Sequence, residues 1–272
     1  MTRRVAAVIG SPVAHSLSPL IHQAGFDSVG VDWTYVAFDV GAGATSGALD
    51  AMRTLGLGGL SVTMPHKEAM AGAVDRLDPA ARDLGSVNTV SWDGDDLVGS
   101  STDGAGFVAS LASDGVDVGG AHVAVIGAGG AGRSLVDALG RSGASRVTVI
   151  NRSRERAQRA ASLAPGAVVG EEGDVVGADV VVNATSLGMG ATGPGGAWPC
   201  DPSLLGPSQV VVDLVYHPLR TPWLHAAARR GCRALDGLGM LVHQAALQQR
   251  IWLGDDAAVD VAAMRAAARA AL

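Results

Sequence analysis

The feature that most constrains the fold of this chain is a glycine cluster set between a strand and a helix. Positions 127–132 read Gly-Ala-Gly-Gly-Ala-Gly, directly after the β-branched run His122–Ile126 and before the helix expected over Arg133–Arg141. In that setting the glycines of a G-x-G-x-x-G pattern allow a tight turn, a close approach of pyrophosphate to the backbone, and contact between helix and strand. The helix start then presents free N–H groups to the phosphates. The cluster therefore predicts a dinucleotide-binding βαβ unit.

The residues after the next strand indicate which dinucleotide binds. NAD-binding chains usually place Asp or Glu there, to accept a hydrogen bond from the ribose 2′-hydroxyl. Here the expected strand Arg146–Ile150 is followed by Asn-Arg-Ser-Arg-Glu-Arg at positions 151–156. Guanidinium groups bind phosphate through charge-assisted hydrogen bonds, and arginine at a helix start opposes the helix dipole, which favours an anion-binding purpose over a solvated basic helix. The pattern predicts NADP rather than NAD.

Short β-branched runs alternate with helical stretches, a pattern typical of parallel sheets covered by helices. Strands of a first series are expected at Val5–Ile9, Trp33–Phe38, Gly59–Thr63 and Thr89–Trp92, with helices over Ser18–Ser28 and Thr45–Leu55. Strands of a second series are expected at His122–Ile126, Arg146–Ile150, Asp179–Asn183 and Val210–Leu214, followed by helices over Met240–Trp252 and Ala257–Leu272. The sequence therefore predicts an α/β protein of two domains, with the site in the cleft between them.

Charge and cysteine content exclude several classes of function. The 272 residues carry a formal net charge of -6, which argues against nucleic acid as a partner, since nucleic acid is held mainly by Lys and Arg. Cys200 and Cys232 form neither a disulfide framework nor a metal-ligand spacing, so no metal is expected. The apolar stretch Val5–Ile9 is too short for a signal peptide or a membrane span, and no later segment is long enough. We expect a cytoplasmic protein with a small-molecule substrate, either a monomer or a homodimer.

Polar side chains gather at strand ends of the first series, where α/β sheets hold their ligands. Ser16 and Ser18 stand two residues apart before a helix, so both hydroxyls can point at one anion, which would also meet the helix N-terminus. Helix capping by Ser18 is the plainer interpretation, but it leaves Ser16 unexplained. Lys67, Asn88 and Asp103 also lie in turns, where a surface charge, a turn former and a helix cap are the plain alternatives.

A longer series of motifs runs through the chain in order. They are Gly10–Pro19 (G-x-P-x-x-H-S-x-S-P), Val62–Lys67 (V-T-x-P-x-K), Asn88-Thr89, Thr102–Gly104, the glycine cluster, Asn151–Ser153, Asn183–Met189, Asp213–Tyr216 and Gly239–Gln244. The series resembles the shikimate dehydrogenase family over nearly the whole chain, and together the motifs are far more specific than any one of them.

The resemblance implies reversible, NADPH-dependent reduction of 3-dehydroshikimate to shikimate, a step of chorismate and aromatic amino-acid biosynthesis. It implies that Ser16, Ser18 and Tyr216 hold the substrate carboxylate. The ring hydroxyls and the reacting oxygen would be contacted by Thr63, Asn88 and Gln244, together with the catalytic residues Lys67 and Asp103. The implied cofactor-binding residues are Gly127, Ala128, Gly129, Gly130, Ala131, Asn151, Arg152, Ser153, Arg154, Arg156, Thr185, Leu214 and Gly237.

The resemblance also implies a domain division and a mechanism. The final helices would return to the first domain, giving a substrate domain over 1–104 with 238–272 and a Rossmann-type NADP domain over 105–237. Lys67 as an ammonium could stabilise the developing alkoxide and donate its proton, with Asp103 orienting it. An adjacent carboxylate favours the charged lysine and desolvation the neutral one, so acid–base and electrostatic roles both stay open.

Two positions depart from the family pattern, and other functions remain alternatives. Ser61 and Ser101 stand where the family commonly has Asn, and the last-helix segment Gln248–Arg250 stands where an aromatic residue is common. A quinate/shikimate dehydrogenase with relaxed cofactor use is the nearest alternative, although Ser18 and the arginines favour shikimate with NADP. A non-catalytic NADP-binding sensor is a second. A tRNA-linked reductase is rejected, because both cysteines lie in or beyond the nucleotide domain and the net charge is acidic.

Overall fold

The computed structural model describes residues 4–190 and 198–272. Its strands are β1 Arg4–Gly10, β2 Trp33–Asp39, β3 Gly59–Val62, β4 Arg76–Leu77, β5 Thr89–Asp93, β6 Asp96–Ser100, β7 His122–Ile126, β8 Arg146–Ile150, β9 Ala167–Gly170, β10 Val180–Asn183, β11 Val210–Asp213 and β12 Arg233–Leu235. Its helices are α1 Ser18–Ser28, α2 Thr45–Leu55, α3 Lys67–Ala71, α4 Pro79–Leu84, α5 Asp103–Ser113, α6 Gly130–Arg141, α7 Arg154–Ala161, α8 Pro222–Arg229, α9 Leu238–Leu253 and α10 Val261–Ala270, with short 3-10 helices η1 Glu172–Gly177 and η2 Pro202–Leu204.

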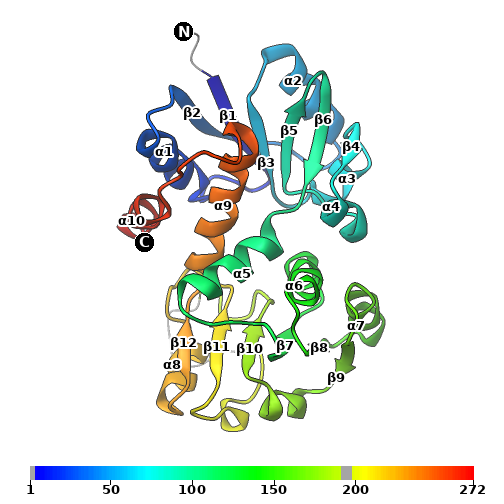
Figure 1. The fold of residues 1–272 in the computed structure, drawn as a ribbon, viewed down its shortest axis with the longest axis vertical. Coiled ribbons are helices and arrows are strands. Elements are labelled where there is room, and N and C mark those ends of the chain that lie inside the picture. Colours follow the sequence, from blue (N-terminus) through cyan, green and yellow to red (C-terminus); the bar gives the residue numbers. More distant parts are fainter. Residues whose placement is uncertain (1–3, 191–197) are drawn as a thin grey trace. The chain divides into compact units, whose positions relative to one another are not determined.

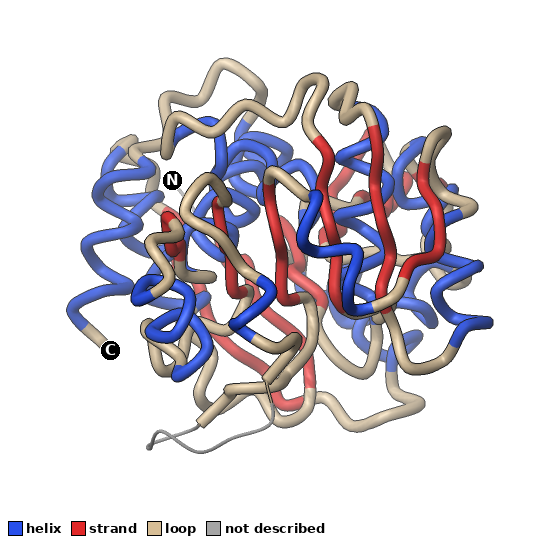
Figure 2. The backbone as a smooth tube through the Cα atoms, turned by 90° about the horizontal axis from the view of Figure 1, so that it is seen from below, coloured by secondary structure: helices blue, strands red, loops and turns tan. Residues whose placement is uncertain are grey.

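The chain divides into two compact units, each with its own sheet. The first unit comprises the residues up to Thr102 together with Val242–Ala271, and the second comprises Asp103–Leu241. The predicted α/β class is confirmed, with strands and helices alternating in both units (Figures 1 and 2). None of the helices in the described ranges is long and apolar enough to cross a membrane.

The first unit is built on a six-stranded sheet in the order β2-β1-β3-β5-β6-β4. β1 lies parallel to both β2 and β3, while β5 runs antiparallel to β3 and β6. Alternate residues of β1 face opposite sides: Ala7 and Ile9 pack in a cluster with α2, and Ala6 and Val8 in a cluster with α1. This central strand is apolar on both faces because helices cover both sides of the sheet. Because β1, β2 and β3 run parallel, the loops that follow them emerge at the same end of the sheet.

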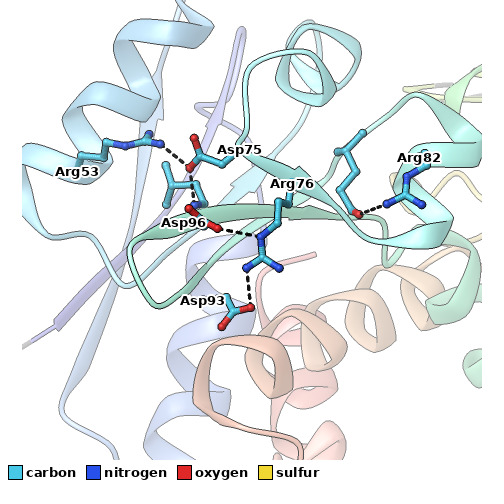
Figure 3. A network of polar contacts seen from close by, with 8 residues as sticks. Arg53, Asp75, Arg76, Arg82, Asp93 and Asp96 are labelled. Carbon is cyan, nitrogen blue, oxygen red and sulfur yellow. Dashed lines mark hydrogen bonds and ion pairs between the residues drawn. The ribbon is translucent and has the colours of Figure 1, made fainter.

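Exposed ion pairs surround β4, the edge strand of this sheet (Figure 3). Arg76 contacts Asp93 at 2.6 Å and Asp96 at 3.0 Å, and Arg53 contacts Asp75 at 2.6 Å. Asp75 also accepts a hydrogen bond of 2.7 Å from the backbone of β6, at Leu97. Because these side chains are solvated, each ion pair contributes little to the stability of the fold. Charged groups at a strand edge also discourage pairing with another chain.

The second unit is built on a parallel six-stranded sheet in the order β12-β11-β10-β7-β8-β9 (Figure 1). The chain proceeds to one side from β7 to β9 and to the other from β10 to β12, so the order reverses between β7 and β10. Ligands of such sheets bind at the carboxyl ends of the strands at this switch point. Ile126 and Asn183 end the two strands and pair with each other, which places the glycine cluster at the switch point.

A close contact between α5 and α6 fixes the start of the second unit. A Cβ added to Gly104 would overlap the carbonyl oxygen of Ser134 in α6, so a larger residue would push the two helices apart. Asp103, the first residue of α5, is thereby fixed to the second unit.

Helix α9 carries buried glutamines that attach its C-terminal part to the first unit. Gln248 donates 3.0 Å to the carbonyl of Asn88, and Gln249 donates 2.7 Å to the carbonyl of His22. Trp252 donates 3.1 Å to the carbonyl of Val90. Both glutamines are buried, and these bonds give their side-chain N–H groups partners inside the protein.

A buried histidine makes the first unit sensitive to acid. His22 is fully buried and stacks on Tyr35, with ring centroids 4.1 Å apart and planes 6° apart. Burial lowers the pKa of His22 to about 3 from an ordinary value of 6.5. Below pH 6.5 the unfolded chain therefore binds this proton and the native state does not, so stability is complete above that pH and is lost as the pH falls toward 3.

We expect the free energy of opening of α1 to fall by about 2 kcal/mol between about pH 7.5 and pH 5 through His22, because each pKa unit is worth about 1.4 kcal/mol. Hydrogen exchange of peptides covering α1 measures this quantity. The His22→Gln variant should lose that pH dependence, while His225→Gln, at an exposed position of α8, should keep it. An unchanged dependence in His22→Gln would assign the acid sensitivity to other groups.

Candidate active site

The glycine turn holds β7 and α6 in close contact and leaves space in front of the helix. Gly127 has φ +114°, and a Cβ added to Gly132 would overlap the carbonyl oxygen of Gly127. At Gly129 and Gly130 an added Cβ would meet no described atom within 4 Å. The helix begins at Gly130, and its first N–H groups have no partner within the helix. The turn thus combines backbone contact on one side with room for a pyrophosphate on the other, which fits a dinucleotide.

Two glycine substitutions should separate folding from cofactor binding. Gly132→Ala should lower the melting temperature of the protein without ligand, because its Cβ would overlap the backbone of Gly127. Gly129→Ala should leave that temperature unchanged, since the site is open, but should weaken NADP by about tenfold or more because pyrophosphate must approach this residue. Thermal melts with and without NADP measure both effects. Equal behaviour of the two variants would contradict the assignment.

A cavity of about 730 Å³ lies beside this turn, within the range typical of ligand sites. It is lined by Ile126, Gly127, Ile150, Asn151, Arg152, Arg154, Val169, Gly170, Glu171, Glu172, Thr185, Ser186, Leu187, Trp198 and Pro199. All of these belong to the second unit. Glu171, Glu172 and Trp198 were not predicted as site residues; the first two follow the unpredicted strand β9, and Trp198 lies between β10 and β11.

The basic wall of the cavity is held in shape by Asn151 and Ser153. Asn151 accepts 3.3 Å from the backbone N–H of Ala128 and donates 3.0 Å to the carbonyl of Ser153. Ser153 caps α7 by accepting 3.3 Å from the N–H of Arg156. Arg152 and Arg154 are exposed and line the cavity, where their guanidinium groups suit a phosphate. Asn151 thus links the glycine turn to the arginines, which fits a dinucleotide carrying a 2′-phosphate.

A buried network shapes the carboxyl ends of β10 and β11. Asn183 donates 2.8 Å to the carboxylate of Asp213 and accepts 2.6 Å from the hydroxyl of Thr185. Asp213 also accepts 2.7 Å from the hydroxyl of Thr221. Burial raises the pKa of Asp213, although its hydrogen bonds oppose the rise. Thr185, a predicted cofactor residue, is therefore fixed at the cavity wall by partners that are themselves hydrogen-bonded.

Leu214 and Gly237 lie together at the carboxyl ends of β11 and β12. The N–H of Leu214 donates 3.0 Å to the carbonyl of Asn183. A Cβ added to Gly237 would overlap the carbonyl oxygen of Leu214, so the two backbones touch. Ala128 is buried and Ala131 half-buried at the glycine turn. Predicted cofactor residues that follow β7, β11 and β12 thus lie at the carboxyl ends of these strands in the second sheet.

Ser18 is the first residue of α1 in the first unit, and Ser16 lies two residues before it. The N–H of Ser18 donates 3.2 Å to the hydroxyl oxygen of Ser16. Leu17 occupies the N-cap position and no side chain caps the helix. Ser18 therefore does not act as the helix cap, and that plainer interpretation is wrong. Both hydroxyls lie at the helix start, as an anion site requires.

Asn88 connects the predicted substrate residues of the first unit. Its side-chain N–H groups donate to the hydroxyl of Thr102 at 3.0 Å and to Gln244 at 3.4 Å. Its side-chain oxygen accepts hydrogen bonds from the N–H of Thr102 at 2.9 Å and from the hydroxyl of Thr89 at 2.8 Å. Asn88 and Gln244 are thus held together, with Thr102 bonded to both. Thr63, at the end of β3, is half-buried and donates from its N–H to Ile9 at 2.9 Å.

Ser61, one of the two departures from the family pattern, is committed to protein partners. It accepts 2.6 Å from the hydroxyl of Tyr35 and donates 2.6 Å to the side-chain oxygen of Gln248. All three side chains are buried. Ser61 and Gln248 thus belong to a hydrogen-bond network that continues to the backbone carbonyl of Asn88.

Lys67 is the first residue of α3 and follows the turn at the end of β3. Its carbonyl accepts 2.9 Å from the N–H of Val87. Among the 20 Lys and Arg residues of the sequence it is the only lysine. The other basic residues are all arginine, and lysine differs from them in carrying a compact ammonium that can give up its proton.

Asp103 and Tyr216 are the predicted substrate residues that belong to the second unit. Asp103 starts α5, and Tyr216 follows β11 and is half-buried. Burial raises the pKa of the Tyr216 phenol, so this group is a neutral hydrogen-bond donor at neutral pH.

The thiols are not reactive groups. Cys200 and Cys232 are free and buried in the second unit. Burial raises the pKa of Cys200 to about 12, so its nucleophilic thiolate is scarce at neutral pH. Within the described residues no cluster of His, Cys, Asp and Glu could hold a metal ion.

Comparison with known families covers most of the chain. Residues 8–90 match the shikimate dehydrogenase substrate binding domain, residues 110–187 match shikimate / quinate 5-dehydrogenase, and residues 237–269 match the shikimate 5'-dehydrogenase C-terminal domain. The shikimate dehydrogenase (NADP(+)) of Geobacter metallireducens is 43% identical over 92% of this chain and 91% of its own length.

Solved structures show the same fold. Shikimate 5-dehydrogenase of Thermus thermophilus, in complex with NADP(H) and shikimate, is 37% identical, with a TM-score of 0.90 over 99% of this chain and 100% of its own. The ligand-free 5-ketofructose reductase of Gluconobacter sp. strain CHM43 is 31% identical, with a TM-score of 0.91 over the full length of both chains. With 43% identity to a full-length relative and family models matched along its length, the chain belongs to the shikimate dehydrogenase family.

Proposed function

We propose that this protein is an NADP-dependent shikimate dehydrogenase, which reversibly reduces 3-dehydroshikimate to shikimate. The observation that carries the proposal is Lys67: the only lysine of the chain stands in the V-T-x-P-x-K motif, at the end of β3. Relatives over 40% identical along most of the chain are named shikimate dehydrogenase (NADP(+)). The quinate dehydrogenase of Corynebacterium glutamicum, in complex with NAD, is 32% identical to this chain.

The two units are assigned different tasks in this proposal. The substrate domain, predicted over 1–104 with 238–272, would correspond to the first unit and the NADP domain, predicted over 105–237, to the second, although Asp103, Gly104 and residues 238–241 fall in the second unit. The glycine turn, the cavity and the arginines of the second unit support the cofactor assignment. The hydrogen bond between Asn88 and Gln244, and the paired serines before α1, support the substrate assignment. A cytoplasmic location and a monomeric or dimeric state are predictions of the same kind.

The second unit would hold the cofactor through groups of three kinds. When bound, NADPH supplies a hydride from its nicotinamide ring. The backbone of Gly127, Gly129 and Gly130 would contact the pyrophosphate at the start of α6. Arg152 and Arg154 would bind the 2′-phosphate of the adenosine ribose. The predicted nicotinamide-side residues are Asn183–Met189, Leu214 and Gly237.

The first unit would bind the substrate and manage its charge. Ser16, Ser18 and Tyr216 would donate hydrogen bonds to the substrate carboxylate. Lys67 as an ammonium would stabilise the negative charge that develops on the reacting oxygen and donate a proton to it. Asp103 would accept a hydrogen bond from a neighbouring hydroxyl of the substrate and favour the charged lysine.

Absorbance of NADPH with purified protein tests this function. We expect turnover with shikimate and NADP, and turnover at least about tenfold lower with quinate, since an extra hydroxyl would meet the paired serines. Reduction of 5-ketofructose with NADPH is the matched comparison for the activity named in the structurally similar reductase. Faster turnover of quinate or 5-ketofructose would contradict the proposed substrate, and NADP binding without any turnover would identify a sensor.

A further inference from the structure

His66 joins the segment that carries Lys67 to the segment between β2 and α2. Its ring nitrogens lie 2.7 Å from the carbonyl oxygen of Val40 and 2.9 Å from the hydroxyl of Thr45. His66 is 1% exposed and Thr45 5% exposed. All three residues belong to the first unit. The ring therefore connects two chain segments that are far apart in the sequence, inside the protein.

The partners fix the tautomer of this ring. A carbonyl can only accept, so Nε2 of His66 carries the hydrogen and donates to Val40. Nδ1 then accepts from the hydroxyl of Thr45. Both polar atoms of the ring are satisfied by these two bonds, and Thr45 gives its hydroxyl to His66 rather than to its own helix, whose start has no side-chain cap. An apolar ring of similar size would leave the Val40 carbonyl and the Thr45 hydroxyl without this partner.

The backbone of His66 sets where α3 begins. Its N–H donates 3.0 Å to the carbonyl of Thr63, and its carbonyl accepts 2.8 Å from the N–H of Met70. His66 is the N-cap residue of α3 and Lys67 is the first residue of the helix. On the other side, the carbonyl of Lys67 accepts from Val87 at 2.9 Å. The main chain of Lys67 is thus held between the histidine and the loop before Asn88.

We propose that His66 is a positioning residue for Lys67, which acts through its hydrogen bonds to Val40 and Thr45. This inference rests on the proposed function, in which the Lys67 ammonium must meet the reacting oxygen. Lysine has a long flexible stem, so the place of its main chain decides which positions the ammonium can reach. Displacement of a catalytic group by about 1 Å can lower a rate by about 100-fold.

The chain offers a matched control in its second unit. His122, at the amino end of β7, also places its ring nitrogens against a carbonyl and a threonine hydroxyl, at 2.9 Å from Gly177 and 2.8 Å from Thr148. It lies at the end of β7 opposite to the glycine turn. His122→Phe and Thr148→Val therefore remove the same two kinds of bond without touching the segment that carries Lys67.

Steady-state kinetics of His66→Phe, His66→Gln and Thr45→Val test the inference. We expect kcat to fall by about 10- to 100-fold in His66→Phe, with a change of less than about threefold in KM for shikimate and in NADP affinity. Thr45→Val, which removes only one of the two bonds, should lower kcat by about three- to tenfold. His66→Gln keeps a donor for Val40 and should retain more activity than His66→Phe. Unchanged kcat in Thr45→Val and His66→Phe would overturn the proposal.

A second readout does not depend on turnover. Because Lys67 is the only lysine, reductive methylation with isotope-labelled formaldehyde gives one lysine side-chain resonance besides that of the terminal amine. That resonance should move in His66→Phe and Thr45→Val and stay in place in His122→Phe. An unmoved resonance, or an equal loss of kcat in His122→Phe, would show that the ring serves stability alone. Were the unaltered protein inactive with shikimate, the proposed function would fail while the resonance still decided the role of His66.

Discussion

Replacing Lys67 by methionine should lower kcat for shikimate oxidation by about 10³-fold or more. Proton transfer by a positioned group contributes about 10²- to 10⁴-fold, and removal of one charged donor at a developing oxyanion costs about 10²- to 10³-fold. Methionine keeps the length of the side chain and removes its charge and its proton. NADP affinity should change by less than about threefold, because the proposed cofactor residues lie in the other unit.

Lys67→Arg separates charge from proton transfer. Arginine keeps the positive charge, but its guanidinium does not release a proton at neutral pH. We expect this variant to stay well below the unaltered enzyme, which would explain why a chain with arginine at every other basic position keeps one lysine. Arg82→Met, at an exposed position in α4, is the control and should retain full activity. Unchanged kcat in Lys67→Met would remove Lys67 from the mechanism.

The double variant Arg152→Ala/Arg154→Ala should weaken NADP by about 100-fold and NAD by less than about threefold. Each charge-assisted hydrogen bond to phosphate contributes about 1.5–3 kcal/mol, and about 1.4 kcal/mol corresponds to a factor of ten in affinity. NAD lacks the 2′-phosphate, so its binding does not use these groups. Isothermal titration of both cofactors measures the two constants.

Arg159→Ala is the matched control for the cofactor prediction. Arg159 lies on the same helix, α7, and pairs with Glu155 at 2.8 Å, with both side chains exposed. Its removal should leave NADP affinity within about twofold, since a solvated ion pair of this kind contributes little. A single Arg156→Ala variant shows whether the third arginine also contacts the phosphate. Equal weakening of NADP and NAD in the double variant would contradict the 2′-phosphate assignment.

The sequence predicted eight of the twelve strands that the structure describes, and all their ends agree within one residue. The strands it missed are β4, β6, β9 and β12. β4 has two residues and β6 begins with Asp96, so neither carries the alternation or the apolar run that marks a strand. β6 forms because it pairs with β5 through the turn Asp93–Asp96, a tertiary effect that local pattern does not contain.

The cofactor half of the site was the more predictable, because its parts are local. A strand, a glycine turn and a helix follow one another directly in the chain, and the arginines follow the next strand. The lining residues Glu171 and Trp198 could not be predicted, because they come from segments separate in the sequence from the glycine turn and the arginines. The bond between His66 and Thr45 has no local signal either. It joins residues 21 positions apart, and each looks ordinary in its own motif.

Transfer of deuterium is the most direct test of the central claim. The purified protein is given 3-dehydroshikimate and NADPH that carries deuterium at the transferring position of the nicotinamide ring, and the product is analysed by mass spectrometry and NMR. The account predicts shikimate with a single deuterium, bound to the carbon that carried the ketone. Shikimate without deuterium, or no shikimate at all from a protein that binds NADPH, would contradict it.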